Sequence, residues 1–177
     1  MNDVFFDLET QKSFQDVGGR ENVRLLRVSV AVTFSTAANA FHSYSEAQVP
    51  ELIAELKAAD RVIGFNILNF DYAVLRAYTT ERLSEIPTLD LLDDLYNKLG
   101  FRVSLDSLAN ATLGMNKSGD GLEAIRWFRE GKIDQLIAYC QDDVAITRKL
   151  FEHGRDNGFV HFVDRYGRKN RVSVSWK

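Results

Sequence analysis

The stretch VFFDLET, residues 4–10, decides the fold, because it places two acidic residues inside an apolar strand. Asp7 and Glu9 are two residues apart, so on a β-strand their side chains point to the same face. An acidic side chain in apolar surroundings is costly to bury unless it is paired or binds a metal. Taken alone, the two residues could also be edge acids that face water, so the rest of the chain must decide between these interpretations.

Asp71 is the third acidic residue that lies beside apolar sequence. It follows Phe70 in GFNILNFD, residues 64–71, and it opens a helix that is predicted over residues 70–78. An acidic residue at a helix N-terminus also complements the helix dipole, and Asn66 could be an ordinary turn residue. The segment by itself therefore leaves a functional and a purely structural interpretation open.

Asp143 is the fourth acidic residue, and it lies in YCQDDVAIT at residues 139–147. Tyr139 precedes it by four residues, so the two side chains share one face of a predicted helix. Asp142 has a different azimuth on that helix and could face solvent, so we favour Asp143 as the functional residue. A half-buried tyrosine beside a solvated acid is the structural alternative.

Four carboxylates at three places in the chain suit a site for divalent metal ions. Mg²⁺ and Mn²⁺ prefer oxygen ligands, which usually include one or two carboxylates for each ion. Two such ions roughly 4 Å apart can activate a water and stabilise the leaving oxygen of an in-line displacement. The set of Asp7, Glu9, Asp71 and Asp143 therefore predicts two bound Mg²⁺ or Mn²⁺ ions and cleavage of phosphodiesters. The hydroxyl of Tyr139 could position the attacking water, although a pKa near ~10 makes it a poor free base.

Composition and charge describe a globular protein of ordinary polarity. The 177 residues are 45% hydrophobic and 11% aromatic, which is enough for one domain with a sizeable core. The net charge of -3 does not suggest a general nucleic-acid coat protein, which would be basic. Cys140 is the single cysteine, so no intramolecular disulfide forms and a reducing, cytoplasmic location is expected.

The N-terminus, MNDVFFDLET, has neither the basic start nor the long apolar core of a secretory signal. The longest apolar runs are far shorter than the ~20 residues that a membrane-spanning helix needs. We therefore expect no membrane association.

Hydrophobic periodicity predicts strands first, then strands that alternate with helices, and a final pair of strands. The expected strands cover residues 4–9, 23–34, 40–45 and 61–66, and residues 159–176 hold the final two strands. The expected helices cover residues 49–59, 70–78, 104–114, 122–130 and 133–153. Residues 86–100 are expected to combine a short strand with a helix. This order predicts an α/β fold of three layers, in which helices flank a mixed central β-sheet, plus a C-terminal hairpin. Because no stretch resembles a linker, residues 1–177 are expected to form a single domain.

The acidic motifs resemble, in type and order, those of the DEDD superfamily of 3′–5′ exonucleases, whose fold is ribonuclease H-like. FDLET is similar to its first motif, GFNILNFD to the second, N-x₃-F-D, and YCQDD to the third, Y-x₃-D. The matching positions are Asp7 and Glu9, then Asn66, Phe70 and Asp71, then Tyr139 and Asp143. Each motif alone is a weak signal, whereas the three in this order cover most of the chain and form a strong one.

The third motif indicates the tyrosine (DEDDy) branch of that superfamily. Position 138 is Ala, and Tyr139 stands four residues before the last acid, which resembles the branch that holds the proofreading domains of family A and family B DNA polymerases. Other segments are similar to a bacterial group of predicted exonucleases related to the family B proofreading domain. These segments are LETQKSFQDVGG (8–19), VSLDSLANATLG (103–114), LEAIRWFREG (122–131) and VSW (174–176).

The resemblance implies a two-metal-ion 3′–5′ exonuclease that acts on the 3′ end of single-stranded DNA, with RNA as the second choice. It implies that the four acids bind the ions and that Thr10, Asn66 and Phe70 bind the substrate. A helicase or a polymerase could act with it as a partner in trans. A catalytically silent nucleic-acid-binding module and an endonuclease of the same fold are the two rival interpretations.

The glycine-rich segment GMNKSGDG, residues 114–121, is open to two interpretations. It is not a P-loop, because Asp120 stands where that motif requires lysine. The segment could be a plain connecting loop, or a flap that touches a substrate phosphate through Lys117.

Two further groups of side chains also allow two interpretations. Trp127 and Phe128, between Arg126 and Arg129, could stack on bases, although core packing is more common at this spacing. Basic residues surround the expected turn of the C-terminal hairpin and could hold a nucleic-acid backbone, or could simply be a solvated hairpin tip. These residues are Arg165, Arg168, Lys169 and Arg171.

Overall fold

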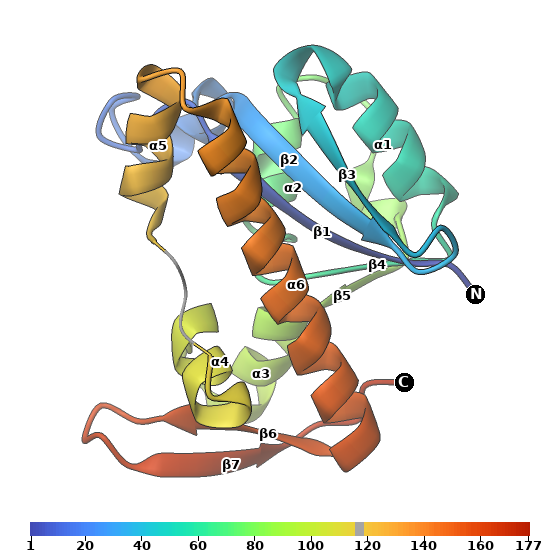
Figure 1. Cartoon of the computed structure of the whole chain (residues 1–177), viewed down its shortest axis with the longest axis vertical. Helices are drawn as coiled ribbons and strands as arrows, with labels where there is room; N and C mark the ends of the chain where they lie inside the picture. The colour runs from blue at the N-terminus through green and yellow to red at the C-terminus, as the bar shows by residue number, and fades with distance from the viewer. Residues whose placement is uncertain (116–118) are drawn as a thin grey trace.

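A computed structural model describes residues 1–115 and 119–177, and a five-stranded mixed sheet lies in its upper half as drawn in Figure 1. The strands are β1 (Asp3–Thr10), β2 (Val28–Ser35), β3 (Ala40–Ser45), β4 (Arg61–Gly64) and β5 (Thr88–Asp90), in the spatial order β3-β2-β1-β4-β5. Strand β1 pairs antiparallel with β2 and parallel with β4, and β4 pairs parallel with β5. The expected mixed sheet is therefore confirmed.

Strand β1 is the middle strand, so its two faces contact both helical layers. Val4, Phe6 and Leu8 are buried in the apolar cluster on one face, whereas Phe5 is buried in the cluster on the other. Because side chains alternate along a strand, Asp7 and Glu9 lie on the same face as Phe5. That face is covered by α5 (Gly121–Arg129) and α6 (Ile133–Asn157), both of which contact β1.

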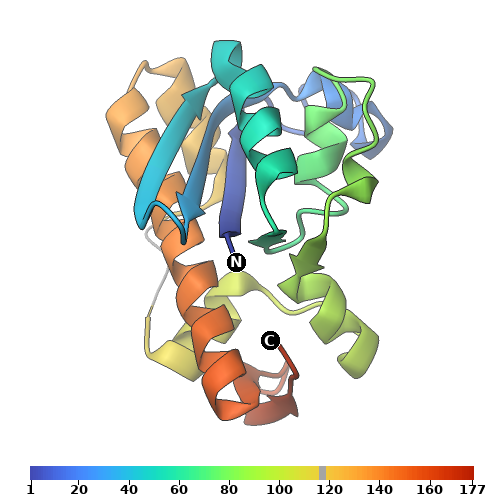
Figure 2. The same ribbon diagram turned by 90° about the vertical axis from the view of Figure 1, so that its right-hand side faces the viewer.

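Helices flank the sheet on both sides and complete three layers (Figure 2). The helices α1 (Val49–Ala58) and α2 (Asp71–Leu75) cover the face opposite to α5 and α6. Two of the short 3₁₀ segments are η2 (Glu46–Gln48), which leads into α1, and η3 (Leu83–Glu85), which precedes β5. The expected helix over 70–78 is shorter than predicted, because α2 ends at Leu75 and the chain continues in turns.

The predicted strand over 23–34 is wrong in its first part. Residues Arg20–Leu25 form a 3₁₀ helix, η1, and β2 begins only at Val28. Arg27 has a φ of 59°, a left-handed conformation that interrupts an extended chain. Leu26 is buried against the α1 and α2 layer, so tertiary packing of this apolar residue outweighs the local preference for a longer strand.

Below the sheet in Figure 1, α3 (Leu91–Leu99), α4 (Leu105–Leu113) and the hairpin of β6 (Phe159–Val163) and β7 (Lys169–Ser173) gather around the lower half of α6. The hairpin is antiparallel, which confirms the expected C-terminal pair of strands. One buried apolar cluster joins this group to the sheet and includes Phe5, Leu108, Leu150, Val160 and Trp176. The hairpin therefore packs on the same core that supports β1.

Hydroxyl groups of α4 hold the hairpin by its edge. The backbone N–H of Val163 donates to Ser107 Oγ at 3.1 Å, and that of His161 donates to Thr112 Oγ1 at 2.9 Å. The Thr112 hydroxyl in turn donates to the carbonyl oxygen of His161 at 2.9 Å. These bonds satisfy part of the free edge of β6 and fix the position of the hairpin relative to α4.

The longest helix, α6, links the sheet to the hairpin with its 25 residues. Its buried side includes Leu136, Val144 and Leu150, while charged residues such as Asp142 and Arg155 occupy exposed positions. This pattern is that of an amphipathic helix at a protein core. Among the described residues, no helix has both the length and the apolar character that crossing a bilayer requires.

Candidate metal centre and active site

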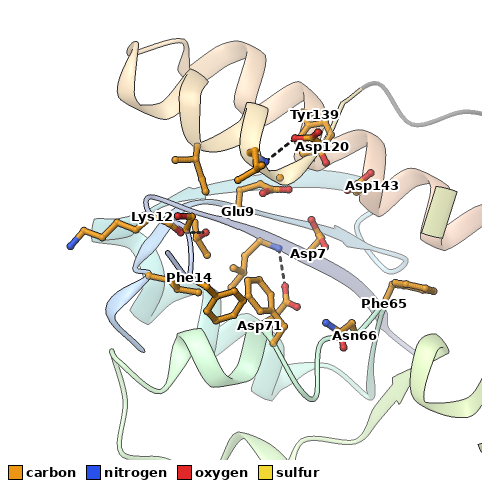
Figure 3. Close-up of a pocket in the computed structure, with 18 of the residues that line it drawn as sticks. Asp7, Glu9, Lys12, Phe14, Phe65, Asn66, Asp71, Asp120, Tyr139 and Asp143 are labelled. Carbon is orange, nitrogen blue, oxygen red and sulfur yellow. Dashed lines mark hydrogen bonds between the residues drawn. The ribbon is translucent and has the colours of Figure 1, made fainter. Parts of the chain in front are cut away.

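Three of the four predicted acids converge where α6 crosses β1 (Figure 3). One carboxylate oxygen from each of Asp7, Glu9 and Asp143 lies within 4.8 Å of the other two. Strand β1 supplies the first two from one face, and the packing of α6 on that face brings the third. The fold therefore places three anionic groups close enough to share a cation.

The orientation of α6 distinguishes between its two adjacent aspartates. Asp143 is buried, with only 5% of its surface exposed, whereas Asp142 is exposed. Tyr139, one turn earlier, is buried on the same side as Asp143. The helix therefore directs Asp143 towards Asp7 and Glu9, and Asp142 towards solvent.

Asp71 is buried at the start of α2, beside the three-acid group. Its Oδ1 accepts a hydrogen bond from the backbone N–H of Leu8 at 3.1 Å, which ties α2 to β1. In Figure 3, Asp7 lies between Asp71 and Asp143. Burial raises the pKa of Asp71 well above its ordinary value, and the negative charge of Asp7 raises it further. The site therefore concentrates negative charge that a bound cation would neutralise.

Tyr139 lies beside the acids with its ring packed edge-on against Trp127, at 5.6 Å between ring centroids. Burial raises the pKa of its hydroxyl, and the charges of Asp143, Glu9 and Asp7 raise it further. The hydroxyl therefore remains neutral at physiological pH. A neutral phenol can donate a hydrogen bond to a water or a substrate oxygen, but it cannot act as a free base.

A cavity of about 710 Å³ opens over the acids. Its lining combines Asp7, Glu9, Asp71, Tyr139 and Asp143 with apolar and aromatic side chains. Phe14 and Phe70 meet edge to face there, with ring centroids 6.0 Å apart. The cavity therefore pairs a charged floor with an aromatic wall on the side of Phe14 and Lys12 (Figure 3).

The three predicted substrate-binding residues, Thr10, Asn66 and Phe70, all line this cavity. The Thr10 hydroxyl donates to the carbonyl oxygen of Lys12 at 2.9 Å and shapes the loop after β1. Asn66 has a φ of 69°, and its Oδ1 accepts a hydrogen bond from Arg102 at 2.7 Å. Asparagine adopts the left-handed backbone more readily than most non-glycine residues, so this conformation fits the turn that follows β4.

Asp90 supports the site, although the sequence analysis did not single it out. Its buried carboxylate accepts hydrogen bonds from the backbone N–H groups of Asn66 at 2.8 Å and Leu68 at 3.0 Å. It also caps α3 by accepting from Leu92 and Asp93. Burial raises the pKa of Asp90, and these N–H groups oppose the rise. The signal that could have revealed it is an aspartate at the end of an apolar strand directly before a helix.

Cys140 and Asp120 also lie next to the acids. The Cys140 thiol is buried and lies 3.6 Å from Asp7 Oδ2, to which it can donate. Burial raises the pKa of Cys140 well above its usual range, so the group remains a neutral thiol. Asp120 caps α5 by accepting from the N–H groups of Leu122 and Glu123, and it lies beside Tyr139 in Figure 3.

The structure also bears on the groups whose role was left open. Trp127 is buried in the core, and Phe128 packs against that core, so neither is displayed for stacking on bases. Arg126 and Arg129 form ion pairs with Glu123 and Asp16. Lys117, the residue of the alternative flap, lies outside the described residues.

Comparison with known proteins identifies a family and a fold. Residues 4–154 match the family model described as the RNase H superfamily. The chain is similar in structure to the family B DNA polymerase from the hyperthermophilic archaeon Pyrobaculum calidifontis, with a TM-score of 0.66 and 17% sequence identity. It is also similar to E. coli ExoI in the zinc-bound ExoI–ssDNA complex, with a TM-score of 0.58 and 14% identity.

The two structural alignments cover most of this chain but less than half of either similar protein. The aligned region covers 87% of this chain and 24% of the polymerase chain, and 88% of this chain and 41% of the ExoI chain. This chain therefore spans about a quarter of the polymerase and two fifths of ExoI. No curated protein matches the chain in sequence. At these identities the structural likeness shows a common fold.

Proposed function

The chain belongs to the RNase H superfamily, and from that premise we propose that it is a metal-dependent 3′–5′ exonuclease of the tyrosine (DEDDy) branch. It hydrolyses phosphodiester bonds at the 3′ end of single-stranded DNA, with RNA as the second choice of substrate. The observation that carries this proposal is the convergence of Asp7, Glu9 and Asp143 within 4.8 Å, in a cavity that Asp71 and Tyr139 also line.

The donor set fits two Mg²⁺ or Mn²⁺ ions. Every candidate ligand in the cluster is a carboxylate, and hard divalent cations prefer oxygen ligands. We assign Asp7, Glu9, Asp71 and Asp143 as the residues that hold them. When bound, the ions would activate a water and stabilise charge on the attacking and leaving oxygens.

The residues of the chain then supply position and orientation. The neutral Tyr139 hydroxyl donates a hydrogen bond that orients the attacking water. Phe70, with Phe14 behind it, offers an aromatic surface on which the terminal base packs. Asn66 and Thr10 line the same cavity as the acids, where they contact the sugar and phosphate of the last nucleotides.

The continuous core from β1 to Trp176 supports the prediction that residues 1–177 act as one domain. The lone, buried Cys140 agrees with a cytoplasmic, reducing environment. A helicase or polymerase that works in trans stays a prediction that rests on the sequence resemblance.

The test is a gel assay with a single-stranded DNA oligonucleotide labelled at its 5′ end. Wild-type protein in Mn²⁺ or Mg²⁺ should yield a ladder that shortens from the 3′ end, and EDTA should prevent it. Asp7→Ala should abolish cleavage and leave the fold intact, because it removes a carboxylate from the three-acid group without disturbing the apolar face of β1. Thermal unfolding of both proteins checks that the fold is kept.

A pair of neighbouring substitutions provides a matched control. Asp143→Asn removes a buried charge of the site, whereas Asp142→Asn removes an exposed charge from the same turn of α6. The first should abolish cleavage and the second should leave it unchanged. Equal cleavage rates for wild type and Asp7→Ala would refute the exonuclease assignment. Tight binding of a single strand without turnover would favour the catalytically silent binding module. Cleavage of a circular single strand would favour an endonuclease.

A further inference from the structure

The cavity over the acids is one end of a longer depression. A second cavity, of about 500 Å³, shares four of its lining residues with the first, namely Asp7, Phe65, Asn66 and Asp143. The second cavity extends to Arg102, Val103 and Ser104, and these three residues also line a third cavity, of about 810 Å³. The three cavities therefore adjoin one another from Phe14 to the C-terminal hairpin.

The third cavity, here called the hairpin groove, lies between the start of α4 and the β6–β7 turn. Its lining consists of Phe101, Arg102, Val103, Ser104, Ser107, Phe162, Val163, Asp164, Arg165, Tyr166 and Asn170. Two of its aromatic residues face solvent, with Phe101 45% and Tyr166 65% exposed. Large exposed aromatic side chains are costly to hydrate, so their presence in one groove indicates a surface that is used for binding.

The charge of the groove is opposite to that of the protein. Its lining contains two basic residues, Arg102 and Arg165, and one acidic residue, Asp164, whereas the whole protein has a net charge of -3. The guanidinium of Arg165 lies over the ring of Tyr166, 4.8 Å from its centroid, and so places a cation beside an aromatic face. Aromatic faces interleaved with arginines are the combination that binds single-stranded nucleic acid without sequence preference.

The one acidic residue of the turn serves the structure of the turn. Asp164 accepts hydrogen bonds from the backbone N–H groups of Arg168 at 3.0 Å and Tyr166 at 2.9 Å, and from Arg168 Nε at 3.0 Å. These bonds, the Arg168 N–H first, lower the pKa of Asp164 to about 2, although burial opposes them. The carboxylate therefore stays ionised and orders the turn that presents Arg165 and Tyr166.

The position of the groove relative to the acids is fixed by the fold. The hairpin is bonded to Ser107 and Thr112 of α4, and α4 follows directly from Arg102–Ser104. Arg102 reaches back to the site by donating to Asn66 Oδ1 at 2.7 Å. A polymer that lies over the acids can therefore continue along Arg102 into the groove.

We propose that the hairpin groove binds the nucleotides that precede the scissile phosphate in a single-stranded substrate. This inference rests on the proposed exonuclease function. The terminal nucleoside lies over the part of the first cavity that Phe14 and Phe70 line, because its base can stack on these aromatic rings. The preceding nucleotides lie on the other side of the acids, where phosphates meet Arg102 and Arg165 and bases stack on Phe101 and Tyr166.

The test compares substrates that are too short to reach the groove with substrates that fill it. The short substrate is a trinucleotide, and the long one is a thymidine oligonucleotide of about 12 nucleotides, within the usual range of single-strand site sizes. The variant is Arg165→Ala combined with Tyr166→Ala. Arg82→Ala is the matched control, because Arg82 is exposed but lines none of the three adjoining cavities.

On the long substrate, the double variant should lower kcat/KM by about tenfold, through KM and not kcat, because a stacking face and a phosphate contact are lost. The slope of log kcat/KM against log salt concentration should become less negative by about 0.7, because one phosphate contact is lost. The trinucleotide should be cleaved at the wild-type rate, and Arg82→Ala should behave as wild type on both substrates. An equal effect on both substrates, or none on the long one, would overturn the proposal.

A binding measurement separates this proposal from the proposed activity. Fluorescence anisotropy of the labelled long oligonucleotide in EDTA tests the groove without any cleavage. If wild type cleaves neither substrate, the exonuclease proposal fails, but weaker binding by the double variant than by Arg82→Ala still supports the groove. Equal affinity for all proteins overturns it. The milder Arg165→Gln, with unfolding temperatures for each variant, keeps the result interpretable if the double variant folds poorly.

Discussion

The acidic site and the hairpin tip carry opposite charge and differ in burial. Asp71 and Asp143 are buried carboxylates among like charges, on elements that are fixed by the core. Arg165 and Tyr166 lie on an exposed turn, where water solvates the cation. Buried like charges are costly unless a proton or a cation neutralises part of them, whereas exposed cations cost little and remain available for phosphates. This contrast is the one expected if, as proposed, the first region binds metal ions and the second binds the nucleic-acid backbone.

After the acids, whose substitution should abolish cleavage, the largest effect should come from Tyr139, which belongs to the first region only. Tyr139→Phe should lower kcat by up to about a hundredfold without abolishing cleavage, because it removes an orienting hydrogen bond and keeps the ring. The ring contact with Trp127 should maintain the fold. Steady-state kinetics on the trinucleotide and the long substrate measure this, and the two substrates should be affected equally. An unchanged kcat would remove Tyr139 from the mechanism.

The free energy of unfolding of two variants, each without one helix cap, provides a second comparison of the two regions. Asp90→Ala leaves four backbone N–H groups without their acceptor next to the acidic site, whereas Ser104→Ala removes the cap of α4 at the hairpin groove. Loss of the Ser104 cap should cost about 1 kcal/mol. Loss of Asp90 should cost about 2 kcal/mol more, because this buried carboxylate is the acceptor for four N–H groups and Ser104 is the acceptor for one.

Denaturant unfolding of both variants measures the difference between the caps. Asp90→Ala should also raise KM for the trinucleotide, since the turn at Asn66 loses two of its bonds. Ser104→Ala should not change that KM. Equal destabilisation by the two substitutions would show that the turn at Asn66 does not depend on Asp90.

The last prediction concerns pH, and its sign follows from the raised pKa of Asp71. The folded protein holds this proton more tightly than the unfolded chain does, so Asp71 contributes stability below the ordinary value of 3.8. That contribution declines as the pH rises towards and through the folded pKa. In EDTA the free energy of unfolding should therefore fall with rising pH, by at most about 1.4 kcal/mol per pH unit from this group.

Asp71→Asn is the control, because the amide keeps an oxygen acceptor for the Leu8 N–H and cannot titrate. The difference in unfolding free energy between wild type and Asp71→Asn should vary with pH in EDTA. Addition of Mn²⁺ should raise the unfolding temperature of wild type at neutral pH and affect Asp71→Asn less, because a cation favours the ionised carboxylates. A difference that is constant between pH 4 and pH 8 would show that Asp71 does not titrate there.

Much of the fold was predictable because it depends on local periodicity. The strands at 40–45 and around VFFDLET, the long helix and the C-terminal hairpin were all expected, and the structure has them. The error at 23–27 shows the limit of that approach. Apolar, β-branched sequence predicted a strand, but the left-handed Arg27 and the burial of Leu26 produce a 3₁₀ helix and a break there.

The candidate site was predictable as a set of residue types, and its catalytic role stays a prediction. Motif spacing could indicate that Asp7 and Glu9 share a face, and that Tyr139 and Asp143 share another. Arg102 had no such pattern, and the position of Asp90 directly before a helix indicated a helix cap but not its bonds to the turn at Asn66. Their importance comes from hydrogen bonds to the turn at Asn66, which connect segments that are distant in sequence.

The sequence by itself determined the strand at VFFDLET, the alternation of strands and helices, and the acidic motifs with their order. Each of these can be read from residues that are close to one another along the chain. Only the tertiary structure decided that Asp143 faces Asp7 and Glu9 while Asp142 faces water, since that depends on how α6 is rotated against β1. It also decided that the basic hairpin adjoins the acidic site through Arg102, because the packing of α4 between them sets their positions.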